Sequence, residues 1–203
     1  MTRLLVILST LLFPYLTFGQ SNKRREATSR DYALLEKSCD CAKVKSLTTK
    51  ERLNIYPFSQ AVKIQLVSFE NGYDSEPRDY LRDSLPRIND TLCYSKLKEV
   101  KTLSTVQIDS LSDLIHNYGF KFRYKLKGNV YFIASTSQCY IPRNAIVFLN
   151  DENKVFEYIE ICFECKKTRN SSDKVNIGVK CNQKLNLIKK FFKRVGIDYG
   201  ISN

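Results

Sequence analysis

Seven cysteines constrain this chain more than any other feature, because cysteines can cross-link segments that are far apart in sequence. All of them follow residues 1–19, which have the pattern of a removable export signal, so we expect them to reach a compartment in which disulfides persist. Because seven is odd, at least one thiol must be free, metal-bound or paired with another molecule. The cysteines are Cys39, Cys41, Cys93, Cys139, Cys162, Cys165 and Cys181.

The export prediction rests on the first 20 residues. Arg3 forms a short basic region, an apolar run extends from Leu4 to Phe18, and cleavage is expected between Gly19 and Gln20. This run is too short for a bilayer span, which needs roughly 20 apolar residues, and no later stretch is apolar enough. We therefore predict a periplasmic or extracellular protein without a transmembrane segment. Cleavage would remove Arg3 and lower the formal net charge from +12 to +11.

The hydrophobic pattern predicts a single α+β domain over residues 31–203, preceded by a flexible polar leader at 20–30. Short connections between neighbouring strands favour a mainly antiparallel sheet with two or three packed helices. The charged residues 70–91 predict a long surface loop. Strands are expected at 61–69, 97–103, 120–126, 130–134, 145–149 and 154–161, and helical segments at 31–38, 47–56, 104–115 and 182–195.

The predicted hairpin of strands 145–149 and 154–161 brings distant cysteines together. If Leu149 lies opposite Lys154, then Cys139 falls opposite position 164 and close to two further cysteines. Cys181 precedes the last helix and is expected to fold back to the same place. The sequence therefore predicts a cluster of four sulfur atoms, from Cys139, Cys162, Cys165 and Cys181.

Three interpretations of this cluster compete. Two structural disulfides would stabilise the fold by about 2–4 kcal/mol each. A zinc site with four thiolate ligands is an alternative, although only one C-x-x-C pair is present. Thiol redox chemistry at Cys162 and Cys165 is the third, although Cys162 ends a strand and lies beside Glu160 and Glu164, which disfavour a thiolate.

The cysteines of the N-terminal half predict one further disulfide. Cys39 and Cys41 are separated by a single residue, which would strain a bridge between them. We expect one of the two to pair with Cys93, which leaves the other as the odd thiol.

Two segments, Cys139-Tyr140-Ile141-Pro142-Arg143-Asn144-Ala145-Ile146-Val147-Phe148 and Tyr158-Ile159-Glu160-Ile161-Cys162-Phe163-Glu164-Cys165, carry a resemblance to known sequences. This part of the chain resembles uncharacterised exported proteins of Bacteroidota-type bacteria, which also place a cysteine before a terminal amphipathic helix, as Cys181 does. The resemblance covers roughly the last 100 residues. That family commonly has histidine at the place of Asn144. The resemblance implies a bacterial periplasmic or secreted setting and brings no known activity.

Arg143 opens a predicted strand directly after this cysteine-containing segment. Its guanidinium group is a candidate contact for an acidic ligand near the sulfur atoms. The favoured interpretation is a structural ion pair with Glu160 or Glu164 across the hairpin.

Residues 166–194 carry ten Lys or Arg and a single acidic residue, Asp173. The predicted helix at 182–195 lies in this range, and it is basic and amphipathic. A helix of this kind is typical of association with an anionic cell-envelope surface or another polyanion. The alternative is a helix that docks on the sheet by its apolar face and leaves its lysines in solvent. Nucleic acid is not an expected partner, because no recognition motif is present and export removes the chain from DNA. The candidate polyanion-binding residues are Lys184, Lys189, Lys190, Lys193 and Arg194.

The chain contains one histidine, His116, which excludes sites with two or more histidine ligands, such as those of HExxH metalloproteases. At a helix C-terminus the helix dipole is expected to favour its protonated form. The leading hypothesis is a non-enzymatic exported protein, a structural or ligand-binding domain with a disulfide-stabilised C-terminal half, a basic surface and no cofactor. The alternative is a thiol-redox or zinc-dependent periplasmic enzyme centred on Cys139, Cys162, Cys165 and Cys181.

Overall fold

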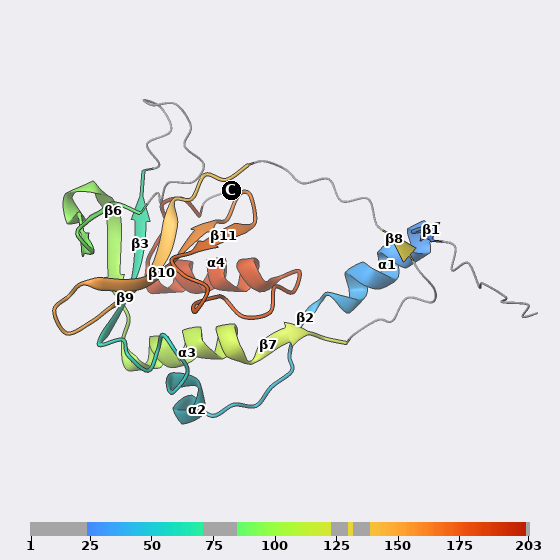
Figure 1. The fold of residues 1–203 in the computed structure, drawn as a ribbon, viewed down its shortest axis with the longest axis horizontal. Coiled ribbons are helices and arrows are strands. Elements are labelled where there is room, and N and C mark those ends of the chain that lie inside the picture. The colour runs from blue at the N-terminus through green and yellow to red at the C-terminus, as the bar shows by residue number, and fades with distance from the viewer. Residues whose placement is uncertain (1–23, 71–84, 123–129, 132–138, 202–203) are drawn as a thin grey trace, which may run out of the picture.

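The computed structural model describes residues 24–70, 85–122, 130–131 and 139–201 (Figure 1). The predicted cleavage position at Gly19 and Gln20 and most of the predicted 70–91 loop lie outside these ranges. The helices are α1 (Ser29–Ser38), α2 (Thr49–Leu53), α3 (Thr105–His116) and α4 (Lys184–Val195), with a 3-10 helix at Tyr94–Lys96. The strands are β1 (Arg25–Glu26), β2 (Cys41–Lys43), β3 (Lys63–Phe69), β4 (Arg87–Ile88), β5 (Thr91–Leu92), β6 (Leu97–Thr102), β7 (Tyr118–Phe120), β8 (Val130–Tyr131), β9 (Asn144–Leu149), β10 (Val155–Cys162) and β11 (Lys167–Asn170).

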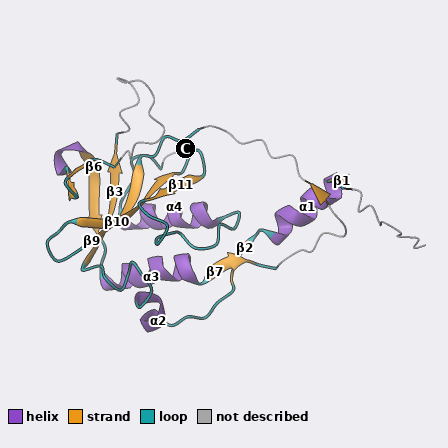
Figure 2. Cartoon of the chain, viewed as in Figure 1, coloured by secondary structure: helices purple, strands orange, loops and turns teal. Residues whose placement is uncertain are grey.

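The principal sheet has five strands in the order β11-β10-β9-β3-β6, and every pairing in it is antiparallel. Strand β9 is apolar on both faces apart from Asn144 and is buried along its whole length, which suits its place in the middle of the sheet. Helices α3 and α4 lie beside the principal sheet, whereas α1 lies apart from it (Figure 2). The predicted α+β fold with a mainly antiparallel sheet is confirmed.

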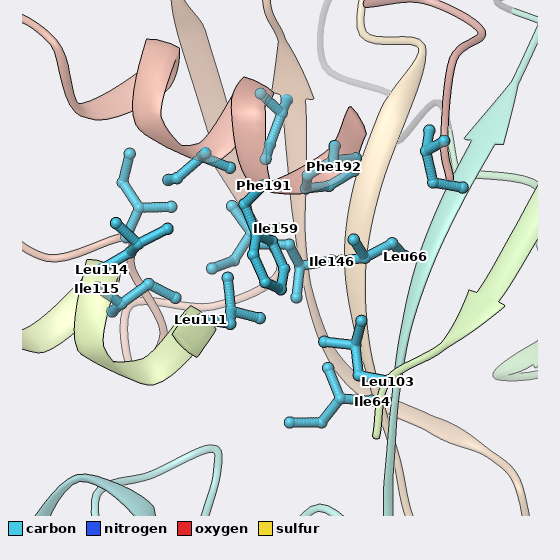
Figure 3. Packing of buried hydrophobic residues seen from close by; sticks show 14 of the residues in the cluster. Ile64, Leu66, Leu103, Leu111, Leu114, Ile115, Ile146, Ile159, Phe191 and Phe192 are labelled. Atoms are coloured by element: carbon cyan, nitrogen blue, oxygen red, sulfur yellow. The ribbon is translucent and has the colours of Figure 1, made fainter. Parts of the chain in front are cut away.

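Helices α3 and α4 cover one face of this sheet (Figure 1). Leu111 and Ile115 of α3 and Phe192 of α4 meet Ile146 and Ile159 of the sheet, and all five side chains are at most 2% exposed (Figure 3). Full burial of a side chain such as Phe192 stabilises the folded state by about 1.5–3 kcal/mol. This face therefore contains the main hydrophobic core.

The opposite face of the sheet carries a smaller apolar cluster. Val67, Val147 and Tyr158 point to this side, where Leu85 and Leu92 from either end of the β4–β5 hairpin pack against them. Glu160 of β10 lies on the same face, next to Leu85 of this cluster.

The N-terminal segment is ordered from β1 onward, and α1 lies at the side of the molecule away from the sheet (Figure 1). Thr28 caps α1 and Arg25 pairs with Asp31 at 2.6 Å, so the predicted flexible leader is wrong for these residues. The hairpin predicted at 120–126 and 130–134 is also wrong for its described ends. Strand β7 pairs with β2, and β8 pairs with β1 in the parallel direction.

Candidate functional site

Three sulfur atoms meet where β10 ends and the turn to β11 begins. Cys139 and Cys165 form a disulfide with a Cα–Cα distance of 5.7 Å. Cys162 is a free thiol with 1% of its surface exposed, and its sulfur and those of the bridge all lie within 4.8 Å of one another. The backbone N–H of Cys165 donates a hydrogen bond to Cys162 Sγ at 3.2 Å. We call Cys139, Cys162 and Cys165 the sulfur cluster.

The strand register explains why Cys139 reaches this turn. The predicted pairing of Leu149 with Lys154 is shifted, since Leu149 pairs with Val155 and a bulge follows, so that Asn144 pairs with Ile161. The shift changes the position opposite Cys139 by about two residues. Cys139 still meets the turn that contains Cys165. The prediction that Cys139 lies near Cys162 and Cys165 is therefore confirmed.

Cys181 does not belong to the sulfur cluster, so the predicted set of four is wrong. It forms a disulfide with Cys41, with a Cα–Cα distance of 5.1 Å and a sequence separation of 140 residues. The predicted pairing of Cys39 or Cys41 with Cys93 is also wrong, because Cys39 and Cys93 are both free thiols.

The pairing also changes the donor set that was predicted for zinc. The sulfur cluster offers three thiolates only after reduction, because two of its sulfurs are joined in the disulfide. Within the described part of the chain, it is the one group of three or more acidic, His or Cys side chains close enough to share a metal ion. The predicted zinc site with four thiolates from these cysteines is therefore not formed.

A buried carboxylate lies two residues before Cys162 on the same face of β10. Glu160 is fully buried and accepts hydrogen bonds from the backbone N–H of Leu85 at 2.6 Å and from the Tyr140 hydroxyl at 3.1 Å. Burial and the adjacent Glu160 raise the pKa of Tyr140. The Arg169 guanidinium stacks on the Tyr140 ring at 4.8 Å. These contacts hold Tyr140 and the strand start that follows Cys139 against β10.

Arg143 pairs with Glu164 at 3.3 Å, and both side chains remain partly exposed. The predicted structural ion pair across the hairpin is confirmed for Glu164. An exposed pair of this kind contributes little to stability, about 0–1 kcal/mol. Its role as a contact for an acidic ligand stays a prediction.

Asn144, at the start of β9, is fully buried. Its side-chain amide donates to the Tyr199 carbonyl at 2.9 Å, while Oδ1 has no hydrogen-bond partner among the described residues. Glu99 accepts from the backbone N–H groups of Asp198 and Tyr199 at 3.0–3.2 Å. Together, Asn144 and Glu99 hold the segment after α4 across the end of the sheet.

Lys184 is a buried core residue, so its prediction as a polyanion contact is wrong. Only 1% of its surface is exposed, and its ammonium donates to the carbonyls of Leu114, Ile115 and Tyr118. These carbonyls lie at and just after the end of α3, where the last turn of a helix leaves carbonyl groups without intrahelical partners. Burial lowers the pKa of Lys184 to about 8. The buried lysine therefore joins the start of α4 to the end of α3.

His116 lies beside this lysine, and the structure overturns the expected effect of the helix dipole. Burial, followed by the positive charges of Lys184, Lys45 and Arg52, lowers the pKa of His116 to about 4. Its ring packs edge-on against Phe58, with centroids 5.5 Å apart. The neutral imidazole is therefore the form present at pH 7, because burial and three cations outweigh the dipole.

The remaining basic residues of α4 reach solvent. Lys190, Lys193 and Arg194 are exposed and Lys189 is half-buried, as expected for the polar side of an amphipathic helix. Spacings of three and four residues place the three exposed cations on one side of the helix. The exposed Lys101 of β6 lies beside the end of α4, where a Cβ on Gly196 would lie 3.3 Å from its Cε. We call Lys101, Lys190, Lys193 and Arg194 the basic surface.

A small cavity of about 190 Å³ lies at the start of α4. Cys181, which forms the disulfide with Cys41, contributes to the wall of this cavity, and so do Lys166 and Lys180. The cavity is lined by Lys166, Thr168, Lys180, Asn182, Leu185 and Asn186, among others.

Two polar features of the site escaped the sequence analysis. Lys184 follows the same helical spacing as Ile188, Phe191 and Phe192, and this spacing was the available signal that its side chain turns inward. The contacts of Glu160 had no such signal, because Leu85 and Tyr140 approach it from segments with no periodic pattern.

Comparisons with models of protein families, with curated proteins and with solved structures find no match to this chain. Over the described ranges, the structure contains no helix with the length and apolar character needed to cross a bilayer.

Proposed function

We propose that this protein is an exported, non-catalytic binding domain that attaches to a polyanion through its basic surface. The observation that carries the proposal is the cluster of cations on the exposed side of α4. Lys190, Lys193 and Arg194 make no ion pair with any residue in the described ranges, so their charges are available to a ligand. The apolar side of the same helix is anchored in the core by Phe191 and Phe192.

The remaining features support the exported setting. The two disulfides fit an oxidising compartment, and the N-terminal pattern of residues 1–19 fits an export signal. Both bridges involve the C-terminal half of the chain, in which residues 166–194 alone keep nine cations once the buried Lys184 is set aside. A rigid frame that displays these cations favours binding, because little side-chain and backbone order is lost when a polyanion attaches.

The test measures binding of the folded protein to heparin, used as a polyanion probe, at a series of salt concentrations. We expect affinity to fall steeply with salt, because exposed charges are screened over about 8 Å at physiological ionic strength. The triple variant K190Q/K193Q/R194Q should bind about 100-fold more weakly, at roughly 1 kcal/mol for each charge lost near an anionic surface.

A matched control removes the same charge elsewhere. Lys37, Lys50 and Lys121 are exposed residues in the N-terminal arm, in α2 and just after β7. The variant K37Q/K50Q/K121Q should retain most of the affinity. Binding that ignores salt, or an equal loss in both triple variants, would overturn the proposed role of the basic surface.

A further inference from the structure

The sulfur cluster places a free thiol against a disulfide, which is an arrangement that the basic surface does not explain. We infer that Cys162 is an internal nucleophile that exchanges with the Cys139–Cys165 disulfide. The protein then has two disulfide isomers, with either Cys139 or Cys162 as the free thiol. This inference does not rest on polyanion binding.

Proximity is the first argument. All three sulfur atoms lie within 4.8 Å of one another, and Cys162 is the last residue of β10 while Cys165 lies in the tight turn that follows it. Only a small movement of this turn is needed to bring Cys162 into contact with the sulfur of Cys165. Thiol–disulfide exchange requires such direct approach of a thiolate to one sulfur of the bridge.

The hydrogen bond to Cys162 is the second argument. The Cys165 N–H points at Cys162 Sγ from 3.2 Å, and a sulfur that carries negative charge accepts such a bond more strongly than a neutral one. The contact also holds the sulfur of Cys162 beside Cys165, the residue that it attacks.

The reaction balances without an external oxidant or reductant. Cys162 loses its proton to solvent, and its thiolate attacks Sγ of Cys165. The Cys162–Cys165 bond forms as the Cys139–Cys165 bond breaks, and Cys139 leaves as a thiolate that takes up a proton from solvent. The number of disulfides and of free thiols is the same before and after the step.

The exchange changes which sulfur meets solvent. Cys162 is almost completely buried, whereas Cys139 is only partly buried. A molecule with a disulfide or another thiol-reactive group would therefore react at Cys139, although Cys162 is the resting free thiol. The site is thus assigned to a thiol-reactive ligand that cannot reach the buried Cys162 and reacts with Cys139 after the exchange.

The other bridge offers an internal comparison. Cys39 is a free thiol two residues from Cys41, but its sulfur does not form a comparable group with Cys41 and Cys181 in the described part of the chain. Its sulfur lies 4.0 Å from the Ser38 hydroxyl instead. We therefore expect no exchange at the Cys41–Cys181 bridge.

The test follows alkylation of the oxidised, folded protein by N-ethylmaleimide at pH 8, with acid quenching and digestion at acidic pH. The expected result is a label on Cys139 that rises with time toward one equivalent, together with a Cys162–Cys165 disulfide in the same molecules. At pH 4 the label on Cys139 should be absent, because thiolate is required for exchange. A Cys139 that stays unlabelled at pH 8 would overturn the inference.

Variants identify the nucleophile. In C162S the labelling of Cys139 should fall at least tenfold, while the control C93S, which removes a different free thiol, should label like the wild type. Equal labelling of Cys139 in C162S would show that another thiol attacks the bridge, and the inference would then be wrong.

A second variant keeps the test decisive if C162S does not fold. In oxidised C139S we expect a Cys162–Cys165 disulfide and free thiols only at Cys39 and Cys93. Two free thiols at Cys162 and Cys165 in this variant would also overturn the inference.

Discussion

The two disulfides of this protein have similar spans in space and different settings. Cys41–Cys181 joins residues 140 apart in sequence, with hydrogen bonds on both sides of it, from Asn182 N–H to the Cys39 carbonyl at 2.8 Å and from Cys41 N–H to the Gln183 side chain at 2.7 Å. Cys139–Cys165 joins residues 26 apart and has a free thiol as its neighbour. A bridge that closes a long loop and has no competing sulfur fixes the fold, whereas a short-range bridge beside a third sulfur can change partners.

Removal of the long-range bridge is the strongest way to test this contrast. The variant C41S/C181S should lose about 5 kcal/mol in free energy of unfolding, because a loop of 140 residues is no longer closed in the unfolded chain. Urea unfolding of the oxidised protein measures the loss. A loss below about 2 kcal/mol would show that the hydrogen bonds around this bridge hold the N-terminal arm without it.

The short-range bridge should contribute less. The variant C139S/C165S should lose about 3.5 kcal/mol, since the closed loop has 26 residues. The single variant C139S should lose less than the double variant, because Cys162 can then pair with Cys165. Equal losses in the two variants would indicate that no such replacement bridge forms.

Lys184 tests the surroundings of the long-range bridge. The variant K184M keeps the length of the side chain but leaves the carbonyls of Leu114, Ile115 and Tyr118 without their donor. We expect a loss of about 2–3 kcal/mol, which is the cost of buried acceptors without partners. The matched variant K190M on the exposed side of α4 should change stability by less than about 0.5 kcal/mol.

The smallest expected effect is a pH dependence at His116. Its folded-state pKa is about 4, below the usual histidine pKa of 6.5, so the unfolded chain binds more protons between these two values. The stabilisation is present above pH 6.5 and is lost as pH falls toward 4. Between pH 7.5 and 5 the loss should be about 2 kcal/mol, measured by urea unfolding.

The variant H116F isolates this contribution. It keeps a ring against Phe58 and cannot be protonated. The free energy of unfolding of H116F should therefore fall less steeply with decreasing pH than that of the wild type. An unchanged slope in H116F would assign the acid sensitivity to carboxylates such as Glu157. Burial acts to raise the pKa of Glu157, but hydrogen bonds from Ser171, Ser172 and Tyr56 outweigh it, and the pKa is lowered.

The sequence predicted those parts of the site that depend on local periodicity. Alternation identified strand β3, and the two runs that flank the turn at 150–153 identified β9 and β10. The hairpin register then placed Cys139 near Cys165 despite the bulge beside Val155. Spacing alone could not place Cys181, because residues 171–183 between β11 and α4 follow no repeating pattern that fixes their path. The disulfide partner of Cys41 could therefore not be predicted from the sequence.

The assignment of Lys184 failed for a different reason. Its charge suggested an exposed position, although the residue lies on the apolar side of its helix. A buried lysine is stable there because three carbonyl groups of α3 and β7 accept hydrogen bonds from its ammonium group, and the sequence of the helix that carries the lysine gives no sign of these partners. His116 was misjudged in the same way, since its neighbouring cations come from three other segments.

The order of the cysteines along the chain has a consequence for biosynthesis. Cys39, Cys41 and Cys93 all leave the ribosome well before Cys181, the native partner of Cys41. An oxidase that acted on each thiol as it emerged would join Cys41 to a near neighbour in sequence rather than to Cys181. With such an oxidase, correct maturation would require delayed oxidation or an isomerase that reshuffles early, non-native bridges after the last helix has been made.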